Sequence, residues 1–153
     1  MIRLITGKKG SGKTKIIIDR INTAVKNTNG CLVCIEKGET LRRSISYKVR
    51  WCDTEQFAID TFDAFYGFVA GMLAGNYDIK EIYVDGILKI AGADFEELGR
   101  TLEKLDKLTG DDSVVTFTVS ADVSELPASV TKFVDSWVWI PDNREKCCFF
   151  RIF

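Results

Sequence analysis

Short apolar runs alternate with stretches of helical periodicity along almost the whole chain. In the runs, apolar residues occupy consecutive positions, as in strands buried on both faces, whereas the longer stretches place them three or four positions apart. The runs predict strands at 1–6, 31–36, 48–52, 81–85, 114–120 and 136–140, and the periodic stretches predict helices at 13–27, about 56–75, 94–109 and 126–134. This alternation predicts an α/β fold with a mainly parallel sheet and helices on both of its faces.

The C-terminal part of the chain has a different pattern. Its two apolar runs lie in the segment SWVWIPDNREKCCFFRIF, the second of them near 147–152. The Pro-Asp-Asn sequence between the runs favours a turn. Two strands joined by a short turn are antiparallel. We therefore expect an antiparallel ribbon at this end of the sheet.

A glycine recurs every four residues in the apolar segment FDAFYGFVAGMLAG, at Gly67, Gly71 and Gly75. This spacing puts the three glycines on one face of a helix, where they permit the close approach of another backbone. This face could contact another helix of the same chain or form the seam of a dimer, and we favour the contact within the chain. The segment is also shorter than the ~20 residues needed to cross a bilayer.

Composition narrows the class of protein. The chain has 153 residues, which suffices for one domain, 1–153, with a single core. Hydrophobic residues make up 46% and charged residues 28%, and the formal net charge is −1. This balance is typical of a globular protein, and without a basic face it gives no case for nucleic-acid binding. The N-terminus lacks the regions of a signal peptide, so we expect a cytoplasmic protein without a membrane partner.

Five cysteines and no histidine limit the metal and redox chemistry. Cys31 and Cys34 lie three residues apart in an apolar strand, so their side chains face opposite sides, and the adjacent Cys147 and Cys148 would also diverge on a strand. We therefore favour reduced, buried thiols over a zinc site of four thiolates. Without imidazole, a general base has to be a carboxylate or a water that a carboxylate positions.

The most specific motif is the sequence ITGKKGSGKT, from Ile5 to Thr14, between the first strand and the first helix. It matches G-x-x-x-x-G-K-[ST], in which backbone N–H groups surround the phosphates of a nucleotide. Glycines let the backbone approach an anion, Lys13 reaches the β- and γ-phosphates, and the hydroxyl of Thr14 is a ligand for Mg²⁺. The N-terminus of the following helix also favours an anion. The predicted phosphate-binding residues are Gly7, Lys8, Lys9, Gly10, Ser11, Gly12, Lys13 and Thr14.

Two later strands end in polar residues that fit the same site. Asp85 follows a buried strand, and ligands collect at the carboxyl ends of strands in open α/β sheets. We expect Asp85 to hold Mg²⁺ through water, opposite Thr14, with an ordinary Asp-Gly turn as the alternative. The strand SVVTFTVSAD ends with Ser120, which would lie beside the γ-phosphate if this strand lies between the first strand and the Asp85 strand. An ordinary turn fits Ser120 equally well.

Together these segments resemble the compact core of RecA-like P-loop NTPases. The resemblance covers roughly 1–122 and rests on the segments ITGKKGSGKTKIIID, CLVCIEKGETL, DIKEIYVDGILKI and VVTFTVSAD. It implies a three-layer P-loop NTPase fold in which the 114–120 strand lies between the first strand and the Asp85 strand. It also implies that an acid at the end of the second strand, Glu36 or Glu39, polarises the attacking water. In other branches that acid directly follows the metal ligand, where this chain has Gly86.

The sequence is also similar to short bacterial proteins described as ATP-binding, some of them labelled twitching-motility ATPases. Such a motor would have an additional N-terminal domain and histidine-containing segments, and the sequence has neither. The guanine-reading N/T-K-x-D motif is absent as well. We therefore expect an adenine nucleotide.

The main prediction is a domain that binds Mg-ATP, or a slow ATPase, with the candidate catalytic residues Lys13, Glu36 and Glu39. A second reading is a phosphotransferase that acts on a small hydroxyl-bearing acceptor. Such enzymes usually close arginines over the phosphates. The segment ETLRRSISYKVRW supplies a candidate lid in Arg42, Arg43 and Arg50, although a solvated loop fits these residues better.

A third reading is a nucleotide-dependent adaptor that acts on a partner protein without hydrolysis, since Gly86 stands where a glutamate would be expected. The resemblance implies that an arginine from a neighbouring subunit completes the site, because the loop of one chain neutralises the γ-phosphate charge only in part. No arginine lies in the phosphate loop or beside Asp85. Such a cation would come from the Arg42–Arg43 segment or, in an oligomer, from Arg100 or Arg144 of another protomer.

Overall fold

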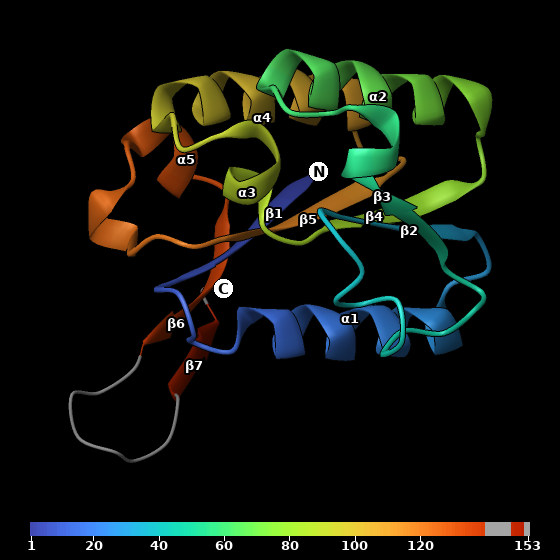
Figure 1. Cartoon of the computed structure of the whole chain (residues 1–153), viewed down its shortest axis with the longest axis horizontal. Coiled ribbons are helices and arrows are strands. Elements are labelled where there is room, and N and C mark those ends of the chain that lie inside the picture. The colour runs from blue at the N-terminus through green and yellow to red at the C-terminus, as the bar shows by residue number, and fades with distance from the viewer. Residues whose placement is uncertain (140–147, 152–153) are drawn as a thin grey trace.

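A sheet of seven strands forms the centre of the computed structural model, which describes residues 1–139 and 148–151 (Figure 1). The strands are β1 (Ile2–Gly7), β2 (Cys31–Glu36), β3 (Arg50–Asp53), β4 (Ile79–Val84), β5 (Val114–Val119), β6 (Val134–Trp139) and β7 (Cys148–Arg151). They lie in the order β3-β2-β4-β5-β1-β6-β7. Strands β1 to β6 pair in parallel, and β7 pairs antiparallel with β6. The predicted α/β fold, with its mainly parallel sheet and C-terminal antiparallel ribbon, is confirmed.

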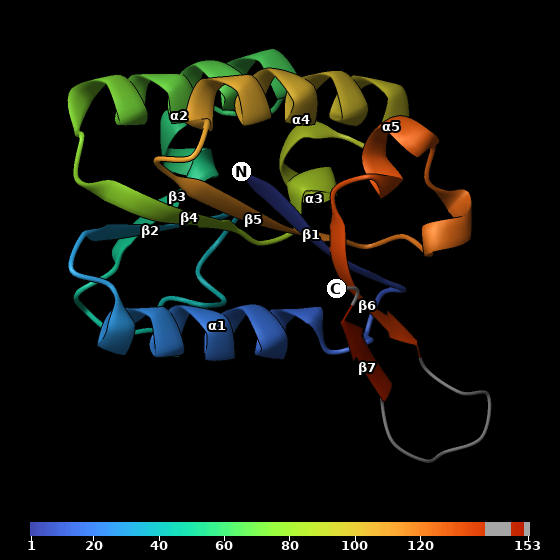
Figure 2. The ribbon, with the colours of Figure 1, turned by 180° about the vertical axis from the view of Figure 1, so that it is seen from behind.

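Helices cover both faces of the sheet, as Figures 1 and 2 show. One face carries α2 (Phe62–Gly75), α3 (Ile87–Ala91), α4 (Phe95–Thr109) and α5 (Ala128–Thr131), and the other carries α1 (Lys13–Asn27). Ile17 and Ile21 of α1 are fully buried in one apolar cluster, while Phe65 of α2 and Leu102 of α4 are fully buried in a second. The sheet therefore separates two cores, in the three layers that the alternating pattern predicts.

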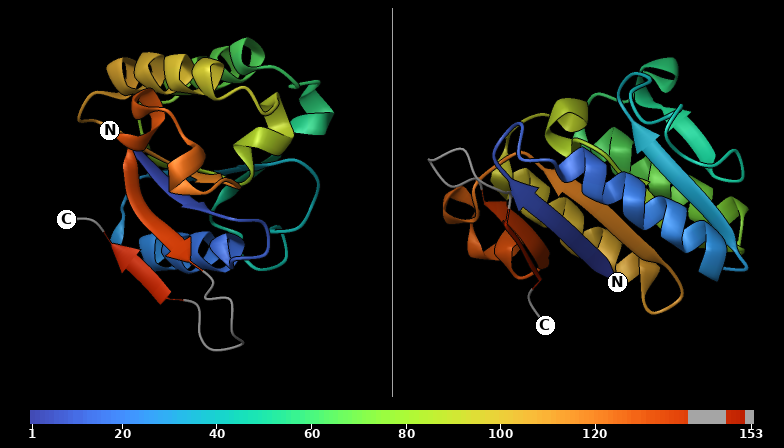
Figure 3. Two further views of the ribbon diagram at one scale, coloured as in Figure 1. Left: turned by 90° about the vertical axis from the view of Figure 1, so that its left-hand side faces the viewer. Right: turned by 90° about the horizontal axis from the view of Figure 1, so that it is seen from below.

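The order of the strands brings the carboxyl ends of β1, β4 and β5 together. Strand β5 lies between β4 and β1, because Val115 pairs with both Ile2 and Ile82. In the right-hand view of Figure 3, β1 in blue and β2 in cyan point to the same end of the sheet. The residues that follow these parallel strands consequently meet at one edge, which in open α/β sheets is the edge where ligands bind.

The helix predicted at about 56–75 is divided in two. A 3-10 turn at Thr54–Phe57 is followed by Ala58 in the left-handed conformation (φ 52°), which ends the turn. Helix α2 then begins at Phe62, where the side chain of Thr61 accepts a hydrogen bond from the N–H of Ala64. The prediction was wrong here because apolar periodicity does not reveal a left-handed alanine.

Several further elements differ from the predicted ones. The short helix α3 was not predicted, and the helix predicted at 126–134 is reduced to α5, which a 3-10 turn at Val123–Glu125 precedes. Strand β6 begins at Val134, earlier than predicted, and β3 extends to Asp53. The helices predicted at 13–27 and 94–109 are present as α1 and α4, whose apolar stripes are long enough to define them. The predicted Pro-Asp-Asn turn lies outside the described residues.

The glycine face of α2 is open to solvent. A Cβ placed at Gly67, Gly71 or Gly75 would meet no atom within 4 Å. The prediction that this face packs against another helix of the chain is therefore wrong. Helix α2 instead buries the face that carries Phe62, Phe65 and Val69. None of the helices in the described part of the chain is both long and apolar enough to span a membrane.

The cysteines differ in exposure. Cys34 and Cys52 are buried and Cys31 is exposed, and none of the three forms a disulfide. The prediction of a buried thiol is therefore wrong for Cys31, which begins β2. Burial raises the pKa of the Cys34 thiol well above its usual value, which makes it a poor nucleophile. The side chains of Cys147 and Cys148 lie outside the described residues.

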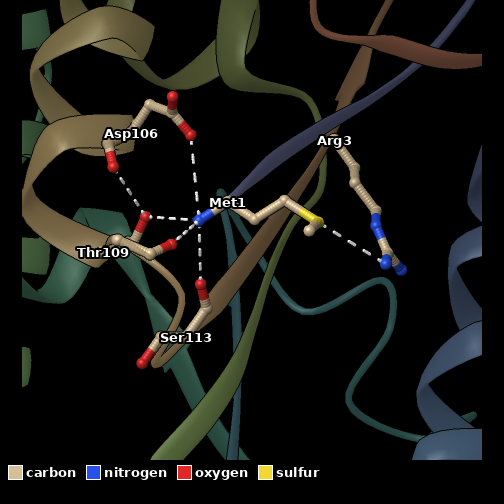
Figure 4. A network of polar contacts seen from close by, with 6 residues as sticks. Met1, Arg3, Asp106, Thr109 and Ser113 are labelled. Carbon is tan, nitrogen blue, oxygen red and sulfur yellow. Dashed lines mark hydrogen bonds and ion pairs between the residues drawn. The ribbon is translucent and has the colours of Figure 1, made fainter.

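The start of β1 is tied to the end of α4 (Figure 4). The terminal ammonium of Met1 donates hydrogen bonds to the hydroxyl of Thr109 (2.7 Å) and to the carbonyls of Gly110 (2.6 Å) and Ser113 (3.1 Å). The carboxylate of Asp106 is 3.7 Å away. A cation is favourable at the C-terminus of a helix. These contacts hold the amino end of β1, whose carboxyl end leads into the glycine-rich loop.

Candidate functional site

The loop 7–14 connects β1 directly to α1. Gly7 ends β1, and a Cβ at this position would lie 2.6 Å from Oγ of Ser11 and 2.7 Å from the carbonyl oxygen of Val138, so no larger residue fits. Gly12 precedes α1 in the left-handed conformation (φ 91°), and no side chain caps the helix. The first N–H groups of an α-helix have no partner within the helix. The N-terminus of α1 therefore offers donors and a positive dipole end to an anion.

Lys13 is the first residue of α1 and is only 6% exposed. Its ammonium donates hydrogen bonds to the carbonyls of Gly7 (2.7 Å) and Lys8 (2.8 Å), and lies 3.4 Å from the hydroxyl of Ser11. Burial lowers the pKa of Lys13, the charge of Asp85 opposes this change, and the charge of Lys89 adds to it. The loop thus encloses a lysine that is close to both an acid and a second cation.

Asp85 lies directly after β4 and opposite Thr14, as the sequence predicts. The hydroxyl of Thr14 donates to Oδ2 of Asp85 (3.4 Å), and the hydroxyl of Thr118 donates to Oδ1 (2.7 Å). The N–H of Gly86 in turn donates to the Thr118 hydroxyl (2.7 Å). Thr118 therefore fixes the orientation of the Asp85 carboxylate from the neighbouring strand β5.

These residues line a hollow of about 290 Å³ at the carboxyl edge of the sheet. Its charged and hydroxyl-bearing walls come from the loop, from β4 with the turn after it, and from β5: Lys9, Lys13, Thr14, Asp85, Lys89, Thr118 and Ser120. Gly10 and Gly12 complete the loop side. The carbonyl of Lys8 accepts a hydrogen bond from Lys13, and Ser11, also in the loop, is buried.

Sequence reasoning missed Thr118 and Lys89. Thr118 is one of several threonines and valines in β5, and only the strand order reveals that it faces Asp85. Lys89 lies four residues after Asp85, on α3. The signal for Lys89 is the sequence DGILKI, in which a helix that begins after glycine places Lys89 one turn from its start.

Glu36 and Glu39, the two candidate bases, do not line this hollow. Glu36 is 2% exposed, and its carboxylate accepts hydrogen bonds from the N–H groups of Thr40 (3.0 Å) and Leu41 (2.9 Å) and from Nε1 of Trp51 (2.8 Å). Burial raises the pKa of Glu36, and these hydrogen bonds oppose the increase. With both oxygens engaged, Glu36 holds the segment after β2 in place.

The arginines of the proposed lid are also away from the hollow. Arg42 pairs with Glu39 (3.1 Å) and stacks on the ring of Trp51, with 4.8 Å between the guanidinium carbon and the ring centroid. Arg43 and Arg50 are exposed. Of the two arginines considered for a neighbouring subunit, Arg100 is exposed on α4, and Arg144 lies outside the described residues.

The donor set at the hollow fits magnesium. Mg²⁺ in nucleotide sites uses one or two protein oxygens, together with phosphate oxygens and water. The hydroxyl of Thr14 and the carboxylate of Asp85 provide such a pair. Among the described residues, no group of three or more histidine, cysteine or acidic side chains is placed to hold a metal without such help. The site therefore suits a metal that arrives with a phosphate ligand.

A larger hollow, of about 530 Å³, lies between α1 and the sheet at the amino end of β1. Several of its polar groups already have partners within the chain. Glu81 accepts hydrogen bonds from Thr28 and Tyr83, and Arg20 pairs with Asp135 (2.7 Å). We therefore assign the candidate site to the smaller hollow, where free helix N–H groups, a buried lysine and a half-buried carboxylate converge.

The sequence matches no protein-family model and no curated protein.

Proposed function

We propose that the protein binds Mg-ATP in the 290 Å³ hollow, and that it is a P-loop nucleotide-binding domain of the RecA-like type. One observation carries the proposal. The loop that matches G-x-x-x-x-G-K-[ST] encloses Lys13 at an uncapped helix N-terminus, and Asp85 faces Thr14 across the same hollow. The strand order, with β5 between β4 and β1, supports the RecA-like assignment.

Each residue of the hollow has a role in this proposal. The N–H groups of the loop and of the first turn of α1 bind the α- and β-phosphates. Lys13 exchanges the carbonyls of Gly7 and Lys8 for phosphate oxygens. Thr14 and Asp85 hold magnesium, which neutralises charge on the β- and γ-phosphates when bound. Thr118 keeps Asp85 oriented, and Ser120, which also lines the hollow, is assigned to the γ-phosphate.

The surroundings of the hollow favour binding over rapid hydrolysis. Asp85 is the one carboxylate that lines it in the described part of the chain, and the proposal assigns this group to the metal. Glu36 is fully engaged by three donors, and Glu39 pairs with Arg42. A general base must reach the proton that it removes, directly or through one water. We therefore expect slow ATP turnover at most, as in an adaptor that changes its contacts with the nucleotide state.

A phosphotransferase has less support. Transfer to an acceptor requires cations that close over the phosphates. Arg42 is held by Glu39 and Trp51, and neither Arg43 nor Arg50 lines the hollow.

Calorimetric titration with ATP tests the proposal. We expect saturable heat in the presence of Mg²⁺, weaker binding after addition of a chelator, and a loss of affinity of at least about tenfold in Lys13→Ala. GTP should bind no better than ATP. Absence of heat at about 1 mM nucleotide, or a Lys13→Ala protein that binds as tightly as wild type, would reject it.

A further inference from the structure

Lys89 is a second lysine at the edge of the hollow, on an element that follows the metal-binding position. Gly86 precedes α3 in the left-handed conformation (φ 71°), and α3 begins at Ile87. Ile87 and Ile90 are buried in the core, at 0% and 2% exposure, so they fix the rotation of this short helix. The remaining side, which carries Lys89, faces the hollow.

The glycine at position 86 leaves room for the side chain of Lys89. A Cβ at Gly86 would lie 3.3 Å from Cδ and 3.6 Å from Cγ of Lys89, so the lysine stem passes directly over this residue. A glutamate at position 86, as in other branches of RecA-like proteins, would compete for that space. Gly86 therefore leaves the position after Asp85 without an acid and at the same time lets the Lys89 side chain approach.

Charge in the hollow is unbalanced. Lys9, Lys13 and Lys89 line it against the single carboxylate of Asp85, a formal excess of two positive charges. Lys89 is exposed, and its ammonium has no hydrogen-bond or ion-pair partner in the part of the chain that the structure describes. Its charge is close enough to Lys13 to lower the pKa of that lysine. An anion with several charges would relieve the repulsion between the two ammonium groups.

We propose that Lys89 bonds the terminal phosphate of a bound nucleoside triphosphate and so supplies, within one chain, a second lysine for the phosphate charge beside Lys13. The inference rests on the proposed function. The loop and Lys13 surround the α- and β-phosphates, whereas Lys89 approaches from the side of Asp85 and Thr118. In the proposed binding mode the loop holds the α- and β-phosphates, so the γ-phosphate, which a diphosphate lacks, is the group that reaches that side. Lys89 therefore distinguishes ATP from ADP.

Calorimetric titration of ATP and ADP, each with Mg²⁺, into wild type and Lys89→Gln tests this role. We expect Lys89→Gln to weaken ATP about tenfold and ADP less than about twofold, since a charge-assisted hydrogen bond is lost for one ligand only. Lys89→Arg, which keeps the charge, should retain most of the ATP affinity. Lys48→Gln is the matched control, because it removes the same charge from an exposed position outside the hollow.

The outcomes separate this inference from the proposed function. Suppose that wild type binds ATP. If Lys89→Gln binds ATP equally well, or loses affinity for ATP and ADP alike, the role of Lys89 is rejected, whereas the proposed nucleotide site is retained. An equal loss in Lys48→Gln would show a long-range charge effect and would also reject it. If wild type binds neither nucleotide, both the proposed function and the role of Lys89 are rejected.

Discussion

Glu36 and Asp85 are both acids at the carboxyl ends of neighbouring strands, and the structure uses them differently. The N–H of Asp85 donates to the carbonyl of Ile35 (2.9 Å), so the two acids lie at the same level of the sheet. After Glu36 the chain folds back and turns the N–H groups of Thr40 and Leu41 onto its carboxylate. After Asp85 the chain leaves as α3, and the carboxylate faces the hollow. The segment that follows a strand thus decides whether its terminal acid becomes an anchor or a ligand.

Removal of the Glu36 carboxylate should have the largest effect on stability. Glu36→Ala leaves three buried or half-buried donors without an acceptor, each of which costs about 1–3 kcal/mol, and we expect a loss of about 3 kcal/mol in unfolding free energy after relaxation. Urea denaturation measures it. Glu39→Ala, which breaks only an exposed pair with Arg42, should change the value by less than about 0.5 kcal/mol.

The anchor role of Glu36 would be contradicted by the reverse pattern. A Glu36→Ala protein as stable as wild type but without ATP turnover would identify Glu36 as a catalytic base instead. Glu36 and Asp85 would then both act on the bound nucleotide, and the difference between a structural acid and a ligand-binding acid would not hold.

Asp85→Asn should affect the ligand and leave the fold intact. Asparagine still accepts the hydrogen bond from Thr118 but carries no charge for a metal. We expect the gain in ATP affinity on addition of Mg²⁺ to fall about tenfold, or about 1.4 kcal/mol. Unfolding free energy should change by less than about 1 kcal/mol. Titrations with Mg²⁺ and with chelator measure the gain, and an unchanged gain would exclude Asp85 as a metal ligand.

The pH dependence of stability gives a smaller and independent signal. Burial raises the pKa of Glu36, so the folded state holds this proton more firmly than the unfolded state, whose carboxyl titrates near about pH 4.3. The stabilisation from the protonated form is fully present below that pH and is lost as pH rises through the folded pKa. Relative to Glu36→Gln, wild type should therefore become less stable as pH rises from about 4. Denaturation of both proteins across this range measures the difference, and the opposite slope would contradict it.

The individual strands and the two long helices α1 and α4 could be predicted because each lies in an apolar run or in a stretch long enough to show a helical period. The position of β5 between β4 and β1 was implied only by the resemblance to RecA-like P-loop NTPases. Helix α3 could not be predicted, since its five residues, Ile87–Ala91, are too few for a helical pattern. Its orientation depends on the burial of Ile87 and Ile90 against residues distant in sequence. The position of Lys89 at the hollow could not be predicted for the same reason.

The parts of the candidate site that lie within one sequence motif could be predicted. The parts that depend on contacts between residues distant in sequence could not. The spacing within 7–14 already indicates the enclosure of Lys13, and Asp85 is found from its place after a buried strand. The difference between Glu36 and Asp85 was not visible, because Trp51, Thr40 and Leu41 lie in or beside a loop without periodicity. Thr118 became recognisable only with the strand order.

Hydrogen exchange, read by mass spectrometry with and without Mg-ATP, tests the central claim most directly, because it compares the two regions in one experiment. The account predicts slower amide exchange in 7–14 and 85–89 when ATP and Mg²⁺ are present, and no change in 37–41, where the amides of Thr40 and Leu41 already bond to Glu36. The matched control is Lys13→Ala, in which the protection of 7–14 should disappear. Protection in 37–41 without protection in 7–14, or no protection at a concentration that saturates binding, would contradict the account.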